Sequence, residues 1–192
     1  MTTICVVKKG KEVTISADSL TTFGDTRLGR HYKGEHAKIL NLHGSWIGIC
    51  GSSAHHLVII SALAKLEEVK LGSRMDVYET FRRLHPILKE HAFPNPKEDE
   101  DDPYESSQLV SLIANETGIY GVYTMREVFE FDRFWAIGSG RSFALGAMHA
   151  VYDSTKSTAK IAEMGVAAGI EFDTASGPPI VTHTVKLKAE AA

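Results

Sequence analysis

The order of hydrophobic and polar positions over the first eighteen residues predicts a β-hairpin. The opening run is rich in β-branched residues, Lys9-Gly10 is a turn signal, and the run after the turn alternates between apolar and polar residues. If the chain turns near Lys9-Gly10, the numbers of paired residues sum to about 19 or 20. Thr2 is then expected opposite Ala17 or Asp18, so the first polar side chain of the chain has a carboxylate as its neighbour.

The remaining elements follow a regular order. A strand pair is expected at 36–42 and 46–50, then a helix opened by Ser52 or Ser53 and closed by Gly72, and a helix at 73–91 in which Pro86 causes a kink or an early end. Strands are expected at 109–114, 118–123, 127–131 and 180–187, and helices at 142–152 and 157–168, the last of these capped by Ser157. Strands and paired helices in this order predict an α+β fold, a four-layer α-β-β-α sandwich with two antiparallel sheets between helix layers.

Composition narrows the class of protein. The 192 residues are 43% apolar and 23% charged, which is typical of a globular chain, and we expect one domain over 1–192. A net charge of −3 argues against a nucleic-acid partner, and no apolar run has the ~20 residues of a membrane helix. There is no signal-peptide pattern, so we expect a cytoplasmic protein with Cys5 and Cys50 reduced. The histidines have no metal-ligand spacing, and neither a metal nor a cofactor is expected.

The Met1-Thr2 start is the first feature with chemical content. Initiator methionine is removed when the next residue is small, which would leave Thr2 as a free N-terminal threonine. Many proteins begin in this way without consequence. A threonine hydroxyl needs a base to become a nucleophile, however, and an α-amino group with a pKa near ~8 is a base attached to the same residue. With Asp18 brought close by the hairpin, the start of the chain becomes a hypothesis for nucleophilic catalysis.

Separated motifs resemble those of the proteasome β-subunit family, in the same order along the chain. They are Thr2-Thr3-Ile4, Ala17-Asp18-Ser19, Lys38-Ile39, Cys50-Gly51, Ile137-Gly138-Ser139-Gly140 and Asp173-Thr174-Ala175-Ser176-Gly177. The resemblance spans nearly the whole chain and is strongest to the bacterial HslV-like branch. It implies a fold of the N-terminal nucleophile (Ntn) hydrolase type and the activity of a self-compartmentalised threonine endopeptidase.

The resemblance also implies a role for each matching residue. Thr2 is the expected nucleophile, with its amino group as proton acceptor, and Asp18 and Lys38 form the charged pair beside it. The backbone N–H of Gly51 is the expected donor to the oxyanion. The network around the amino group is expected to consist of Ser139, Asp173 and Ser176.

The spacing between Asp18 and Lys38 is about four residues longer than is usual in the family. An insertion is therefore expected between residues 29 and 35, and Lys33 becomes a rival for the role of the lysine. We prefer Lys38 because it begins the apolar strand Ile39-Leu40, as the family's lysine does.

The same resemblance implies how the protein assembles. Identical subunits are expected in stacked hexameric or heptameric rings whose active sites face a chamber, with peptides or unfolded proteins as substrates and an ATP-dependent unfoldase as a partner. The acidic segment 94–107, with Glu98-Asp99-Glu100-Asp101-Asp102, is expected to be a loop within the domain near the axial entrance, either as a charged gate or as a solvated loop without a role.

Two other functions stay open from the sequence. The inserted residues could misplace the lysine, which would give a ring with weak or no peptidase activity. An Ntn amidase that acts on a small metabolite is the third possibility.

Overall fold

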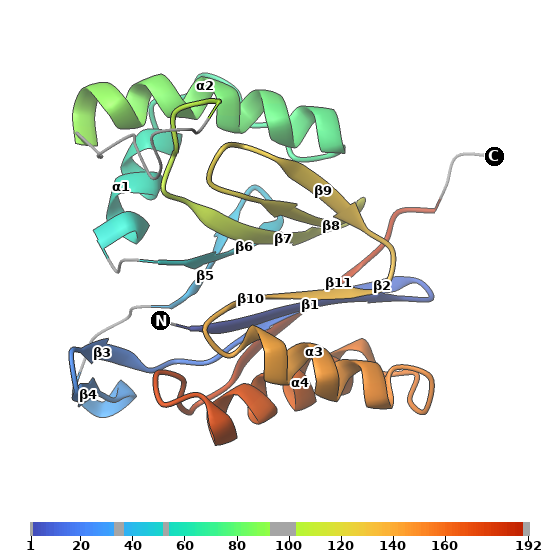
Figure 1. Ribbon diagram of the computed structural model, residues 1–192. Helices are drawn as coiled ribbons and strands as arrows, with labels where there is room; N and C mark the ends of the chain where they lie inside the picture. The colour runs from blue at the N-terminus through green and yellow to red at the C-terminus, as the bar shows by residue number, and fades with distance from the viewer. Residues whose placement is uncertain (1, 33–36, 52–53, 93–102, 190–192) are drawn as a thin grey trace.

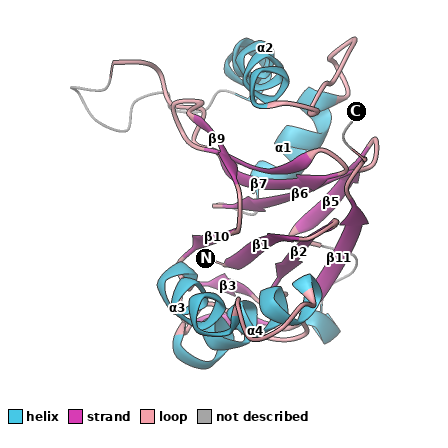
Figure 2. Cartoon of the chain, turned by 90° about the vertical axis from the view of Figure 1, so that its right-hand side faces the viewer, coloured by secondary structure: helices cyan, strands magenta, loops and turns pink. Residues whose placement is uncertain are grey.

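Four layers follow one another in the computed structural model of the chain: helices, a sheet, a second sheet and helices (Figure 1). A view turned by 90° shows the same order of layers (Figure 2). The structure describes residues 2–32, 37–51, 54–92 and 103–189. The predicted α+β sandwich is confirmed, because both large sheets consist of antiparallel neighbours and lie between helix layers.

The two large sheets have the strand orders β10-β1-β2-β11 and β5-β6-β7-β8-β9. The first comprises β1 (Thr3–Lys9), β2 (Glu12–Ala17), β10 (Phe134–Gly138) and β11 (Val181–Lys186). The second comprises β5 (Ile39–Leu42), β6 (Ser45–Cys50), β7 (Val110–Asn115), β8 (Gly118–Val122) and β9 (Val128–Phe131). A small hairpin of β3 (Thr21–Phe23) and β4 (Thr26–Leu28) precedes a 3-10 turn, η1 (Arg30–Tyr32).

The helix layers come from two pairs of helices. One pair is α1 (Ala54–Leu63) and α2 (Arg74–Ala92), which covers the five-stranded sheet; the other is α3 (Arg141–Val151) and α4 (Thr158–Phe172), which covers the four-stranded sheet. The predicted cap of α4 is confirmed, because the Ser157 side chain accepts a hydrogen bond from the backbone N–H of Lys160 at 3.2 Å.

Burial on both faces explains why β1 has a continuous apolar run. Ile4 and Val6 belong to the core between the two sheets, whereas Cys5 and Val7 belong to the core under α3 and α4. All four side chains are fully buried. A strand between two cores has no polar face, so β1 is fixed as a central element of the molecule.

The register of the first hairpin differs from the prediction by one or two residues. The pairs Ile4↔Ala17 and Lys9↔Glu12 leave Gly10 and the residue after it as the loop, and Gly10 has the positive φ of 61° that such a turn requires. Thr3, not Thr2, therefore lies beside Asp18.

Two helix boundaries also differ from the prediction. Helix α1 ends at Leu63, well before Gly72, and α2 continues through Pro86 to Ala92, so an early end at the proline is wrong. Pro86 lies on the exposed side of α2, where the carbonyl group that loses its N–H partner can reach water. Strand β10 and the β3–β4 hairpin were not predicted.

The acidic run at 98–102 and the expected N-terminal helix caps Ser52 and Ser53 lie outside the described residues. The described end of the acidic segment is tied to α2: Lys89 Nζ donates to Glu105 Oε1 at 2.6 Å, and His85 Nδ1 lies 2.9 Å from Ser107 Oγ. In the described part of the chain, no helix has both the length and the apolar character to cross a membrane.

Candidate active site

Thr2 lies at the start of a central strand, against the turn that joins β10 to α3. It is 4% exposed, and its backbone N–H donates to Ser139 Oγ at 3.2 Å. Gly138 in this turn has a φ of +94°, and a Cβ atom there would come within 1.9 Å of the Thr2 carbonyl oxygen. Only glycine allows the turn to approach the start of the chain this closely.

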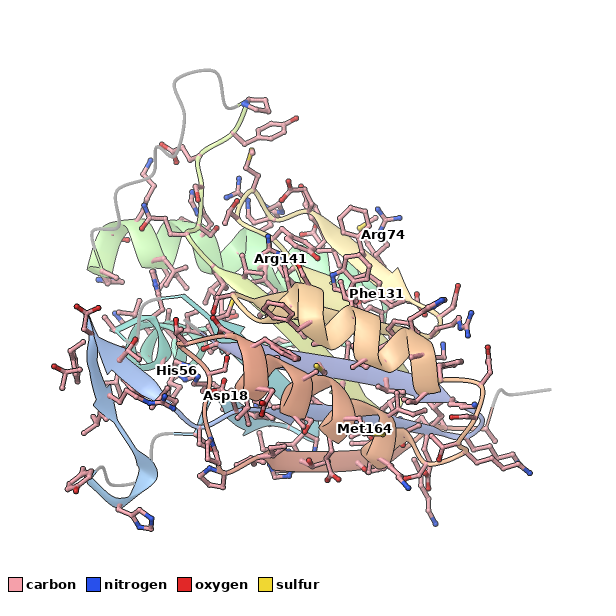
Figure 3. The ribbon with its side chains drawn as sticks, turned by 60° about the horizontal axis from the view of Figure 1, so that its bottom comes forward. Asp18, His56, Arg74, Phe131, Arg141 and Met164 are labelled. Carbon is pink, nitrogen blue, oxygen red and sulfur yellow. The ribbon has the colours of Figure 1, made fainter. Side chains whose placement is uncertain are left out.

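Asp18 lies directly after β2 and is 1% exposed (Figure 3). Each of its carboxylate oxygens has two partners. Oδ1 accepts from Thr3 N at 3.0 Å and Lys38 Nζ at 2.7 Å, and Oδ2 accepts from Leu20 N at 3.1 Å and Gly177 N at 2.9 Å. Three backbone donors from separate parts of the chain fix the carboxylate before it pairs with the lysine.

Lys38 immediately precedes β5, and its side chain is 6% exposed. Burial lowers the pKa of its ammonium group below the usual value of 10.5, while the charge and hydrogen bond of Asp18 act in the opposite direction. The structure thus brings Lys38 to Asp18 despite the longer spacing. The rival, Lys33, lies outside the described residues.

Ser139, Asp173 and Ser176 form one hydrogen-bonded cluster next to Thr2. Asp173 is the residue that ends α4, and its Oδ2 accepts from Ser139 Oγ and from Ser176 Oγ, each at 2.7 Å. Because Ser139 donates its only hydroxyl proton to Asp173, its oxygen is an acceptor toward the N–H of Thr2. All three predicted residues therefore meet at the start of the chain.

Gly51 follows β6 and has a φ of +127°, which favours glycine. A Cβ atom at this position would meet no atom within 4 Å. Among the described residues, the requirement for glycine thus comes from the backbone conformation and not from a close neighbour.

Thr3 is a buried site residue that the sequence did not single out. Its Oγ1 lies 2.7 Å from Ser176 Oγ, and its backbone N–H donates to Asp18. Gly140 and Gly169 flank its side chain so closely that a Cβ atom on either would come within 2.0 or 2.4 Å of Thr3 Oγ1. The sequence shows the Thr2-Thr3 pair, but a resemblance to a family does not reveal whether the second threonine belongs to the site or is an ordinary strand residue.

Neither cysteine has the properties of a competing nucleophile. Burial is the main cause that raises the pKa of the Cys5 thiol, and the charge of Asp18 adds to it. Burial also raises the pKa of the Cys50 thiol, although Lys38 and Arg141 act in the opposite direction. Both thiols are thus kept in the unreactive protonated form.

The arrangement can support acyl transfer. It brings together the backbone nitrogen of Thr2, which becomes an amine when Met1 is removed, the cluster that contains Ser139, and a buried ammonium–carboxylate pair. Across the described residues, no group of three or more His, Cys, Asp or Glu side chains is placed to hold a metal ion.

Comparisons with known proteins find solved structures of similar fold. Two solved structures of BPH from Thiobacillus denitrificans, one of them in complex with epoxomicin, are each 35% identical to this chain with a TM-score of 0.90. The matches cover 97% and 98% of this chain and 100% of each BPH chain. Eukaryotic HslV from Trypanosoma brucei is similar in fold, with 21% identity, a TM-score of 0.65, and 96% of this chain and 99% of that chain covered. A proteasome subunit beta from Nanoarchaeum equitans is 27% identical over an alignment of 202 positions, which covers 98% of this chain and 94% of that protein. No family model matches the chain.

Proposed function

This chain belongs to the family of proteasome β-subunit homologues with the Ntn-hydrolase fold, and we propose that it is a threonine endopeptidase that acts after removal of Met1. The observation that carries the proposal is the position of Thr2. Its backbone nitrogen is hydrogen-bonded to the Ser139–Asp173 cluster, and the next residue is hydrogen-bonded to the Asp18–Lys38 pair.

The Ser139 hydroxyl prepares the amino group of Thr2 to act as a base. In the neutral amine, one N–H donates to Ser139 Oγ, as the backbone N–H does here, and the lone pair stays available. That lone pair accepts the proton of Thr2 Oγ1, directly or through a water molecule, when the oxygen attacks. The base thus belongs to the nucleophile's own residue.

Lys38 contributes a positive charge beside the nucleophile. An ammonium group close to the hydroxyl lowers its pKa and favours the alkoxide. Asp18 holds this ammonium group in place and offsets part of the cost of burying it. The pair explains how a threonine hydroxyl, a weak nucleophile in water, is activated near neutral pH.

The reaction balances with groups that the chain and its substrate supply. Thr2 Oγ1 attacks the peptide carbonyl carbon, the amine takes the hydroxyl proton, and the N–H of Gly51 stabilises the oxyanion. Collapse breaks the C–N bond, and the leaving amine takes this proton from the Thr2 ammonium group. The neutral Thr2 amine then activates a water molecule, which hydrolyses the ester on Thr2 and restores the free hydroxyl.

The proposal includes the assembly. Identical subunits form stacked six- or sevenfold rings that enclose the active sites, and the substrates are peptides and unfolded proteins, delivered by an ATP-dependent unfoldase. We place the enzyme in the cytoplasm, which fits the two free cysteines, Cys5 and Cys50.

Intact mass spectrometry with epoxomicin, which was bound to the Thiobacillus denitrificans relative, tests the proposal. The purified protein is expected to lack Met1 and to gain one epoxomicin mass, and fragmentation of the N-terminal peptide is expected to place the adduct on Thr2 and not on Cys5. Thr2→Ala is the control and is expected to remain unmodified and inactive toward a fluorogenic peptide. An adduct on Cys5 or Cys50, or full peptide hydrolysis by Thr2→Ala, contradicts the assignment.

A further inference from the structure

The hydroxyl of Thr3 has a direction that the surrounding hydrogen bonds determine. Ser176 donates its single proton to Asp173 Oδ2 at 2.7 Å. In the 2.7 Å contact between Thr3 Oγ1 and Ser176 Oγ, Thr3 must therefore be the donor. The result is a continuous chain in which Thr3 donates to Ser176 and Ser176 to Asp173, which also accepts from Ser139.

This chain ends at the amino group of the nucleophile. Ser139 Oγ, which donates to the same Asp173 oxygen, accepts from the nitrogen of Thr2. A shift of Ser176 or Asp173 would thus move the acceptor that orients the amine. Thr3 lies at the opposite end of the chain, fully buried, with its side chain confined by Gly140 and Gly169.

Thr3 also reaches the other half of the site through its backbone. Its N–H donates to Asp18 Oδ1 at 3.0 Å, the oxygen that pairs with Lys38, and its carbonyl oxygen accepts from Asp18 N at 3.1 Å. One residue therefore contacts both the charged pair and the hydroxyl chain, and it follows the nucleophile directly.

We propose that Thr3 is a positioning residue for the reaction, whose hydroxyl orients Ser176 and Asp173 and thereby sets the position of the Thr2 amino group. The proposal rests on the threonine peptidase function proposed above. It assigns the second threonine a role separate from packing in β1.

Thr3→Val tests the role, because valine has nearly the volume of threonine and carries a methyl group in place of the hydroxyl. We expect kcat for a fluorogenic peptide to fall about 10- to 100-fold with KM within about twofold, since a misplaced base slows the chemical step more than substrate binding. Thr3→Ser, which keeps the hydroxyl, is expected to recover most of kcat. Intact mass verifies that Met1 is removed from each variant.

Thr14→Val is a matched control in the neighbouring strand. The Thr14 hydroxyl is buried to the same extent and bonds to Thr158 Oγ1 and Thr184 Oγ1, each at 2.8 Å, away from Thr2. The control loses hydroxyl contacts within the same sheet, so it reports the cost of a missing buried hydrogen bond without a change at the site. Its kcat is expected to stay within about twofold of wild type.

The outcomes separate the two proposals. Wild-type protein that hydrolyses no peptide contradicts the proposed function, whereas an active wild type with Thr3→Val at full kcat contradicts the role of Thr3 alone. Equal losses in Thr3→Val and Thr3→Ser, or in Thr14→Val, would assign the effect to packing and overturn the proposal. If Thr3→Val does not fold, Thr3→Ser is compared with Thr3→Ala, two smaller side chains that differ by the hydroxyl, and equal kcat values overturn it likewise.

Discussion

At the scale of the residue, burial and a neighbouring charge have opposite effects on the pKa of Lys38. Burial lowers the pKa of the ammonium group, and the adjacent carboxylate of Asp18 raises it. The pair remains stable at nearly complete burial because backbone N–H groups from Thr3, Leu20 and Gly177 already satisfy the carboxylate. A lysine in this position has a fixed location and loses its proton more easily than a lysine in water.

This balance predicts the alkaline side of the pH–activity profile. Burial places the pKa of Lys38 below 10.5, so its ammonium group loses its proton before the pH reaches 10.5. Activity is therefore expected to decline as the pH rises, and to do so earlier than for a lysine with the usual pKa. Asp18→Asn removes the charge that raises this pKa, so the decline is expected to move to lower pH and the maximum rate to fall. The measurement is kcat/KM against pH for both proteins, and an unchanged alkaline limb in Asp18→Asn contradicts the prediction.

Substitution of the two candidate lysines distinguishes their roles. Lys38→Ala is expected to lower kcat/KM by at least ~10²-fold, because it removes the charge that supports proton transfer. Lys33→Ala is expected to leave the rate nearly unchanged. A large loss in Lys33→Ala with little effect of Lys38→Ala would mean that the other lysine acts in catalysis.

At the scale of the element, the turn between β10 and α3 links the fold to the site. Gly138 allows the turn to pass over Thr2, and Ser139 then reaches both the Thr2 nitrogen and Asp173. The sequence identified this turn by resemblance but could not supply its reason. The reason depends on β10 pairing with β1, and β10 is an edge strand whose short, partly exposed run gave no clear pattern.

Gly138→Ala and Gly44→Ala form a matched pair for this turn. Both glycines have positive φ values, +94° and +84°, but a Cβ atom at Gly44 would meet nothing within 4 Å. Gly44→Ala is expected to lower the free energy of unfolding by about 1 to 2 kcal/mol and to leave kcat unchanged. Gly138→Ala must also displace Thr2, so urea unfolding is expected to show a larger loss and peptide hydrolysis to be abolished. Full activity of Gly138→Ala contradicts this account.

At the scale of the whole molecule, the elements that could be predicted are those with many buried apolar residues. Strands such as β1 and β7 were predictable from continuous apolar runs rich in β-formers, and helices such as α2 from apolar residues at helical spacing, each packed against a large core. The β3–β4 hairpin was not, because its three-residue strands contain no buried residue and have no such pattern. The candidate site residues were predicted as a set from the resemblance, but the register that places Thr3 beside Asp18 depends on where the turn closes, which propensity alone does not fix.

The outer face of α1 leads to a prediction about assembly. Its inner side chains, Ile59, Ala62 and Leu63, pack into the core under the helix layer, yet Leu57 and Ile60 on the other side are 76% and 48% exposed. Apolar residues on all sides are typical of a helix that is covered on all sides, so the proposed rings are expected to bury this face between subunits.

Leu57→Glu would place a charge in that contact, and we expect it to shift the protein toward smaller species in native mass spectrometry while circular dichroism stays unchanged. Leu57→Met, which keeps the apolar surface, is expected to assemble like wild type. Assembly of Leu57→Glu into complexes of wild-type size would show that the outer face of α1 lies outside the subunit contacts.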